Sequence, residues 1–178
     1  MNAQTAPSQS DDSVQQPVVP KTRLDYMKEA PALTKKLMEL SMVAAKSALG
    51  DTILDLVKIR ASQLNGCSFC IDMHVKEATI HGERALRLHH VAAWRESNLF
   101  VPKERAALAW TEVLTQIPVN GVPDDIYERV RGQFSEAELA ELTFSIMIIN
   151  AWNRANVAFR PVPGGLDKEW HLDRANLA

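Results

Sequence analysis

Apolar residues recur at helical spacing along most of the chain after Pro31, and this pattern restricts the fold more than any other feature. Between Pro31 and Leu49, leucine and valine side chains fall three or four residues apart, and Gly50 follows directly. This spacing gathers apolar side chains on one face of a helix, and glycine commonly follows the last helical turn. No run of alternating apolar and polar residues indicates a strand. The sequence therefore predicts an all-α fold.

Residues that break helices divide the rest of the chain into further predicted helices. Their approximate ranges are 51–64, 67–82, 83–94, 102–117, 125–134 and a last helix from 135. Asn65 and Gly66 form a turn dipeptide, while Ser135 and Glu138 form a capping box. The last helix is apolar on nearly every side as far as Ile149. It is either a central core helix or a helix shared between the core and a subunit interface.

The domain organisation follows from length and local composition. The chain has 178 residues, which suits one domain of about 100–200 residues. Residues 1–21 are rich in Gln, Ser, Asp and Pro, so we expect a flexible N-terminal tail there. We assign residues 22–165 to a single helical bundle. Residues 166–178 are expected to form an irregular C-terminal tail.

Charge and hydropathy exclude several classes of partner. The chain has 20 basic and 22 acidic residues, a net charge of −2, so no basic surface for nucleic acid is indicated. No apolar run approaches the roughly 18–20 residues of a membrane span, and the N-terminus lacks the features of a secretory signal. The two cysteines, Cys67 and Cys70, are too close in sequence to staple a fold. We therefore expect a cytoplasmic protein that binds neither nucleic acid nor membrane.

A short segment after Gly66 holds the residues with the clearest chemical potential. Cys67, Cys70 and His74 are spaced three and four apart, which places them on one face of a helix. Both cysteines stand where that helix is predicted to begin, and free backbone N–H groups and the helix dipole stabilise a thiolate there. The arrangement offers a thiolate nucleophile, a second thiol to resolve it, and an imidazole to take up the proton.

The cysteine pair also allows other interpretations. Both cysteines can be small buried apolar residues of a core. A zinc site would have three ligands in this segment, whereas structural zinc normally needs four, and the next candidate, His81, lies two turns further on. A thioredoxin fold requires strands around the motif, and the flanks here are helical. We favour a helical thiol peroxidase or disulfide reductase without a metal.

Several segments resemble the alkylhydroperoxidase D-like branch of the carboxymuconolactone decarboxylase family. They read LDLVKIRASQLNGCSFCIDMHVKEA, WRESNLF with VPKERAALAWTEVLT, RLDYMKEAPAL from Arg23, and INAWNRANVAFR from Ile149. The resemblance covers roughly residues 23–165. It implies an all-helical, obligately oligomeric protein, a trimer or hexamer, that reduces peroxides through a CxxC pair and uses no haem, flavin or metal as cofactor.

The resemblance also implies roles for individual residues. In the family pattern, a glutamate precedes the first cysteine by twelve positions. Cys70 corresponds to the cysteine that attacks the peroxide, Cys67 to the one that resolves it, and His74 to a histidine of the proton relay. The family glutamate falls on Asp55, whose side chain is one methylene shorter. Either a water bridges that gap or the relay is weakened, and the alternative is that Asp55 is a solvated charge near a helix start.

We therefore expect a thiol-dependent peroxidase. Its partners would be a small hydroperoxide substrate, a dithiol reductant and further copies of itself. One rival is a lactone decarboxylase of the same fold, which has no need of two neighbouring thiols. Another is a redox-sensing oligomer in which the disulfide switches assembly without fast turnover.

Overall fold

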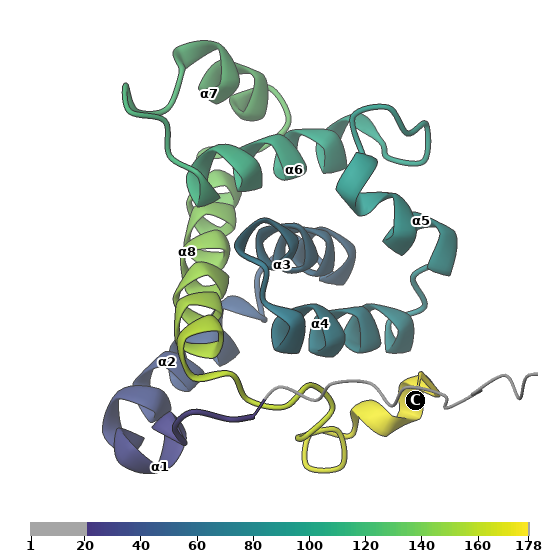
Figure 1. Ribbon diagram of the computed structural model, residues 1–178. Coiled ribbons are helices and arrows are strands. Elements are labelled where there is room, and N and C mark those ends of the chain that lie inside the picture. Colours follow the sequence, from purple (N-terminus) through teal and green to yellow (C-terminus); the bar gives the residue numbers. More distant parts are fainter. Residues whose placement is uncertain (1–20, 178) are drawn as a thin grey trace, which may run out of the picture.

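The computed structural model describes residues 21–177, and all regular elements in that range are helices, as predicted (Figure 1). The predicted N-terminal tail lies outside the described residues, apart from Lys21. The elements are α1 (Tyr26–Glu29), α2 (Pro31–Ala44), α3 (Asp51–Asn65), α4 (Ser68–Ile80), α5 (Ala85–His90), η1 (Val91–Ala93), α6 (Pro102–Thr115), α7 (Asp124–Arg131), α8 (Glu136–Phe159) and η2 (Leu172–Ala175). Within residues 21–177, no helix is long and apolar enough to cross a membrane.

Helix α3 is the centre of the domain, with α4, α6 and α8 packed around it (Figure 1). Leu56, Val57 and Ile59 are almost completely buried, because α3 meets neighbours on several sides. The helix ends at Gly66, whose φ of 65° lies in the left-handed region that favours glycine. This tight ending turns the chain directly into α4, which packs against α3.

Helix α2 ends earlier than the sequence predicts, and it lies at the surface. It stops at Ala44 rather than near Leu49, and none of its residues is buried. The apolar stripe expected on this helix lies largely in the open, with Leu33 76% and Val43 70% exposed. Helix α2 contacts only α1 and α8 closely, which leaves that stripe without a partner in the described chain.

Helix α8 is buried in the core along one face and exposed along another. Leu142 and Ile146 are fully buried in the core shared with α3, α6 and α7. Phe144 and Met147, on the other side of the same helix, are more than half exposed. The helix therefore contributes to the core along one face and presents apolar side chains to the outside along the other.

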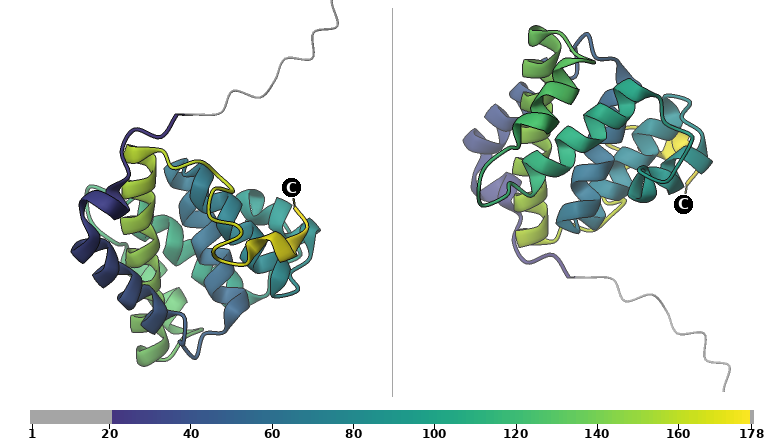
Figure 2. Two further views of the ribbon diagram at one scale, coloured as in Figure 1. Left: turned by 90° about the horizontal axis from the view of Figure 1, so that it is seen from below. Right: turned by 90° about the horizontal axis from the view of Figure 1, so that it is seen from above.

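The C-terminal segment returns across the domain and packs against α4 (Figure 2). Residues 160–177 are irregular apart from turns and η2. The Lys76 ammonium on α4 lies 2.7 Å from an Asp167 carboxylate oxygen, and the Gly164 N–H donates to Asp72 Oδ2 at 3.0 Å. These contacts fix the segment over the helix that carries the cysteines.

Candidate active site

The turn between α3 and α4 brings the two cysteines together. Cys67 is the N-cap residue of α4, and Cys70 lies in its first turn, with the Cα atoms 5.3 Å apart and the sulfurs joined as a disulfide. The Cys67 Sγ accepts a hydrogen bond from the Cys70 backbone N–H at 3.3 Å. The predicted helix start is therefore confirmed, and its backbone donor is directed at the sulfur of Cys67.

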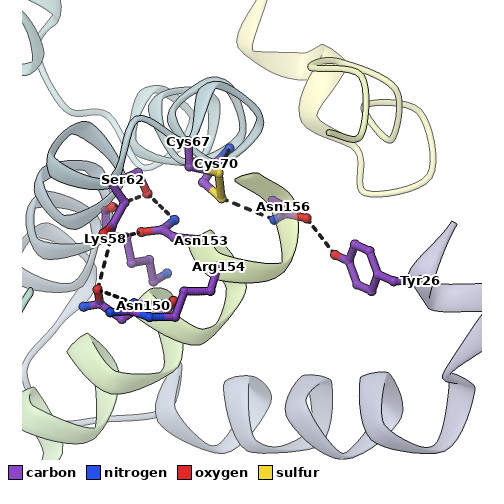
Figure 3. Close-up of a disulfide and its surroundings, with 10 residues drawn as sticks. Tyr26, Lys58, Ser62, Cys67, Cys70, Asn150, Asn153, Arg154 and Asn156 are labelled. Carbon is purple, nitrogen blue, oxygen red and sulfur yellow. Dashed lines mark hydrogen bonds between the residues drawn. A yellow bond between two sulfur atoms is a disulfide. The ribbon is translucent and has the colours of Figure 1, made fainter. Parts of the chain in front are cut away.

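The sulfur of Cys70 has a different polar neighbour, supplied by α8. The Asn156 side-chain N–H₂ donates to Cys70 Sγ at 3.3 Å, and the Tyr26 hydroxyl of α1 donates to Asn156 Oδ1 at 2.7 Å (Figure 3). Burial, together with the negative charge of Asp25, raises the pKa of Tyr26 to about 12. Tyr26 is therefore protonated across the ordinary pH range.

A cavity of about 320 Å³ adjoins Cys70, between α2, α4, α8 and the C-terminal segment. Both cysteines are nearly inaccessible to bulk solvent, at 1–2% exposed, but Cys70 borders this cavity and Cys67 is not among the lining residues. Four methionines contribute to the largely apolar lining, which is completed by aromatic side chains. The larger apolar side chains are Met27, Met38, Met42, Leu54, Met73, Phe69, Ile148, Ile149, Trp152, Trp170 and Leu172.

His74 lies on the cavity wall, and its partner is Glu77. The His74 Nδ1 and a Glu77 carboxylate oxygen are 2.7 Å apart, and both residues line the cavity. Burial lowers the pKa of His74, so the ring is held neutral. Burial also tends to raise the pKa of Glu77, but the hydrogen bond with His74 and the charge of Lys58 outweigh it and bring that pKa to about 2. A neutral ring with Nδ1 bonded to an ionised carboxylate keeps Nε2 for proton exchange.

Asp55 is buried nearby but does not bond directly to His74. Its Oδ2 lies 2.7 Å from His81 Nδ1, and its Oδ1 is buried without a hydrogen-bond partner within residues 21–177. Lys58 stands between the two acids, 4.0 Å from Asp55 and 3.7 Å from Glu77. Burial raises the pKa of Asp55 despite the opposing contributions of His81 and Lys58. His81 is the C-cap residue of α4, and its partner Asp55 lies on α3.

Sequence reasoning did not identify Glu77 or Asn156, the side chains that bond to His74 and Cys70. Glu77 follows His74 by three positions, so helical spacing places both on one face, yet nothing in the sequence separated it from ordinary surface acids. Asn156 is 86 residues from Cys70, and only the packing of α8 against α4 brings them together. Within the described residues, no group of three or more His, Cys, Asp or Glu could hold a metal ion.

Sequence comparisons place this arrangement among known proteins. The model of the Carboxymuconolactone decarboxylase family matches residues 26–113. The chain is 40% identical over 136 residues to the uncharacterized protein YdfG of Bacillus subtilis, which covers 76% of this chain and 92% of YdfG. It is 35% identical over 116 residues to the uncharacterized protein YnjA of Escherichia coli, covering 64% of this chain and 62% of YnjA.

Solved structures share the fold. A protein of unknown function from Agrobacterium tumefaciens, suggested to be the antioxidant defence protein AhpD, superposes with a TM-score of 0.76 at 41% identity, covering 79% of this chain and 96% of that chain. The alkylhydroperoxidase AhpD core of an uncharacterized peroxidase-related protein from Ralstonia eutropha gives a TM-score of 0.67 at 16% identity, over 76% and 73% of the two chains. The second likeness concerns the fold alone.

Proposed function

The chain belongs to the carboxymuconolactone decarboxylase family, in its alkylhydroperoxidase D-like branch, and on this premise we propose that it is a thiol-dependent peroxidase. The observation that carries the proposal is the position of Cys70, which is bonded to Cys67 and borders an apolar cavity beside His74. A cysteine with a resolving partner, a neutral base and access to a cavity has what peroxide reduction requires.

The first half of the proposed cycle oxidises Cys70. The Cys70 thiol transfers its proton to His74, and the thiolate attacks the distal oxygen of the hydroperoxide. The O–O bond breaks as the S–O bond forms, which leaves a sulfenic acid on Cys70 and an alkoxide that takes the proton from His74. The peroxide is reduced by two electrons to an alcohol, or to water when the substrate is hydrogen peroxide.

The second half returns the enzyme to the dithiol. The Cys67 sulfur attacks the Cys70 sulfur, the S–O bond breaks, and hydroxide leaves with the proton of Cys67 as water. A dithiol reductant then reduces the disulfide through a mixed disulfide and is itself oxidised to a disulfide. Such a cycle suits the reducing environment of the cytoplasm.

Glu77, Lys58 and Asp55 would act on this cycle through charge. Glu77 fixes the His74 ring and its tautomer, and Lys58 adds to the effect of His74 in keeping Glu77 ionised. Asp55, predicted to belong to the relay, is proposed to act one step further out by holding Lys58 and His81 in place. No cofactor or metal is part of this proposal.

The cavity favours an organic hydroperoxide as substrate. Its lining is dominated by apolar and aromatic side chains, including flexible methionines that adapt to different shapes. An alkyl group would be buried there with its O–O group facing Cys70. A small charged substrate would gain little from such a lining.

We further propose that copies of the chain associate through α2 and α8. Leu40, Val43, Phe144 and Met147 are exposed, and a second groove lined by three of them runs between the two helices. Apolar side chains gathered in this way commonly mark an interface. A trimer or hexamer would cover them.

The test is a free-thiol count after one equivalent of organic hydroperoxide, combined with turnover by Cys70→Ser and Cys67→Ser variants. We expect the wild type to lose two thiols, Cys70→Ser to be inactive, and Cys67→Ser to react once and stop. A wild type that keeps its thiols, or variants that turn over as fast as the wild type, would contradict the proposal. Conversion of carboxymuconolactone by the double Cys→Ser variant would favour the decarboxylase instead.

A further inference from the structure

The sequence predicted that backbone N–H groups at the helix start stabilise the attacking thiolate. In the structure, the backbone donor there bonds to the sulfur of Cys67 instead. The Cys70 backbone N–H donates to Cys67 Sγ, the sulfur that does not border the cavity. Within residues 21–177, the hydrogen-bond donor to Cys70 Sγ is the side-chain amide of Asn156, at 3.3 Å. Asn156 also lines the cavity. The reactive sulfur is therefore served by a side chain rather than by the backbone.

A hydrogen bond from Tyr26 fixes the orientation of the Asn156 amide. An asparagine can present either its oxygen or its nitrogen to a neighbour, and only the nitrogen stabilises a thiolate. The Tyr26 hydroxyl donates to Asn156 Oδ1 at 2.7 Å, which leaves Nδ2 on the side of Cys70 (Figure 3). Tyr26 is itself held by contact with the Phe159 ring, whose centroid lies 5.5 Å away, and its raised pKa keeps it a donor.

Comparison with its neighbours on α8 sets Asn156 apart. Asn150, Asn153 and Asn156 follow one another at intervals of three, on one side of the helix. The first two bond to polar side chains of the protein frame, such as Asn65, and so hold α8 against α3. Asn156 instead bonds to a reactive sulfur and to Tyr26, although it is only 5% exposed. A buried amide directed at a cysteine sulfur is suited to a chemical role.

We propose that Asn156 is a catalytic residue that stabilises the Cys70 thiolate by hydrogen bonding, and that Tyr26 is a positioning residue that orients its amide. The inference rests on the proposed function, which it deepens. A hydrogen bond to the charged form of a group lowers its pKa, so the donor increases the fraction of thiolate near neutral pH. The same amide remains beside the sulfur when the sulfenic acid forms.

The experiment measures the pKa of Cys70 without peroxide, from the pH dependence of its alkylation by iodoacetamide. A Cys67→Ser background makes Cys70 the sole thiol. Asn156→Leu removes the donor at similar size, Asn156→Asp places a carboxylate at the sulfur, and Tyr26→Phe frees the amide to turn. Trp152→Phe is the matched control, because it removes a hydrogen bond from a cavity-lining residue of the same helix, and that bond goes to the Ser41 hydroxyl rather than to Cys70.

We expect the Cys70 pKa to rise by about one unit in Asn156→Leu, by more in Asn156→Asp, and by a smaller amount in Tyr26→Phe. Trp152→Phe should leave it unchanged. Unchanged pKa values in both Asn156 variants, or an equal rise in the control, would overturn the inference. If circular dichroism shows that the Asn156 variants do not fold, Tyr26→Phe decides, and an unchanged pKa in that variant counts against the inference. Because alkylation needs no peroxide, a wild type without peroxidase activity would refute the proposed function separately.

Discussion

Helices α2 and α4 face the same cavity and are nearly equal in length, yet the rest of the molecule holds them very differently. Helix α4 packs against α3 and α8 and is covered by the C-terminal segment, and five of its residues are buried, among them Cys70 and His74. Helix α2 has no buried residue, and its apolar side chains point largely into the open.

The difference suits the two helices to different roles in the cavity. A wall that is fixed on several sides can hold a nucleophile and its base in one geometry, which catalysis requires. A wall with few buried contacts can adjust to the bound molecule, and it belongs to the part of a fold that opens most readily. We infer that α4 carries the chemistry, whereas α2 shapes the cavity and meets a second copy of the chain.

The largest loss of peroxide turnover is expected from substitutions on α4, which forms the fixed side of the cavity. His74→Gln should lower peroxide turnover by about 100-fold, as the loss of a general base does, and Glu77→Gln by about 10-fold. Because the Glu77 carboxylate raises the pKa of His74, Glu77→Gln should also move the acid limb of the pH–rate profile to lower pH. Asp55→Asn is the matched control, and a greater loss there than in Glu77→Gln would restore the relay that the sequence predicted.

Substitution on the α2 wall should change selectivity and leave the chemistry intact. Met38→Trp narrows the cavity, so turnover of a bulky substrate such as cumene hydroperoxide should fall by about 10-fold, within the range that pocket size usually contributes. Reduction of hydrogen peroxide should continue at the wild-type rate. An equal loss for both peroxides would show that α2 supports the catalytic residues themselves.

The proposed role of the exposed α2 stripe in association can be tested through the oligomeric state of the protein. Placing charge on it with Val43→Glu and Phe144→Glu together should dissociate the proposed oligomer, because charged side chains are disfavoured in an apolar interface. Sedimentation velocity would then report a monomer with unchanged helical content. A wild type that already sediments as a monomer would contradict association through this face.

The smallest effect is expected for the hydrogen bond that joins α1 to α8 beside the cavity, and it concerns stability. Tyr26→Phe should lower the free energy of unfolding by about 1 kcal/mol at neutral pH, since it removes one hydrogen bond. The pKa of Tyr26 is raised from about 10 to about 12, so the wild type loses this stabilisation as pH climbs through that interval. The difference between the two proteins should therefore narrow above pH 10 in urea titrations, and a constant difference would contradict the raised pKa.

The sequence was informative wherever the determining contacts are local. Helical spacing predicted the all-α fold and placed Cys67, Cys70 and His74 on one face, because residues three and four apart are neighbours in any helix. It could not decide whether the stripe on α2 is buried or exposed, since the same periodicity describes a face buried in the core and a face left in the open.

The rest of the site depends on packing between distant segments. Asp55 finds His81 at a separation of 26 residues, and Asn156 meets Cys70 only after α8 has docked. The spacing of residues along the sequence does not predict contacts between such distant segments. The family glutamate therefore led to Asp55, whereas the carboxylate bonded to His74 is Glu77 on the same helix.

The central claim, that Cys70 attacks the peroxide and Cys67 resolves it, is tested most directly by locating the sulfenic acid. The Cys67→Ser variant would be treated with one equivalent of organic hydroperoxide in the presence of dimedone, and the modified cysteine identified by mass spectrometry. We expect near-complete labelling of Cys70 in this variant, and little labelling of Cys67 in the matched Cys70→Ser variant. An unlabelled Cys70, or equal labelling of the remaining cysteine in both variants, would contradict it.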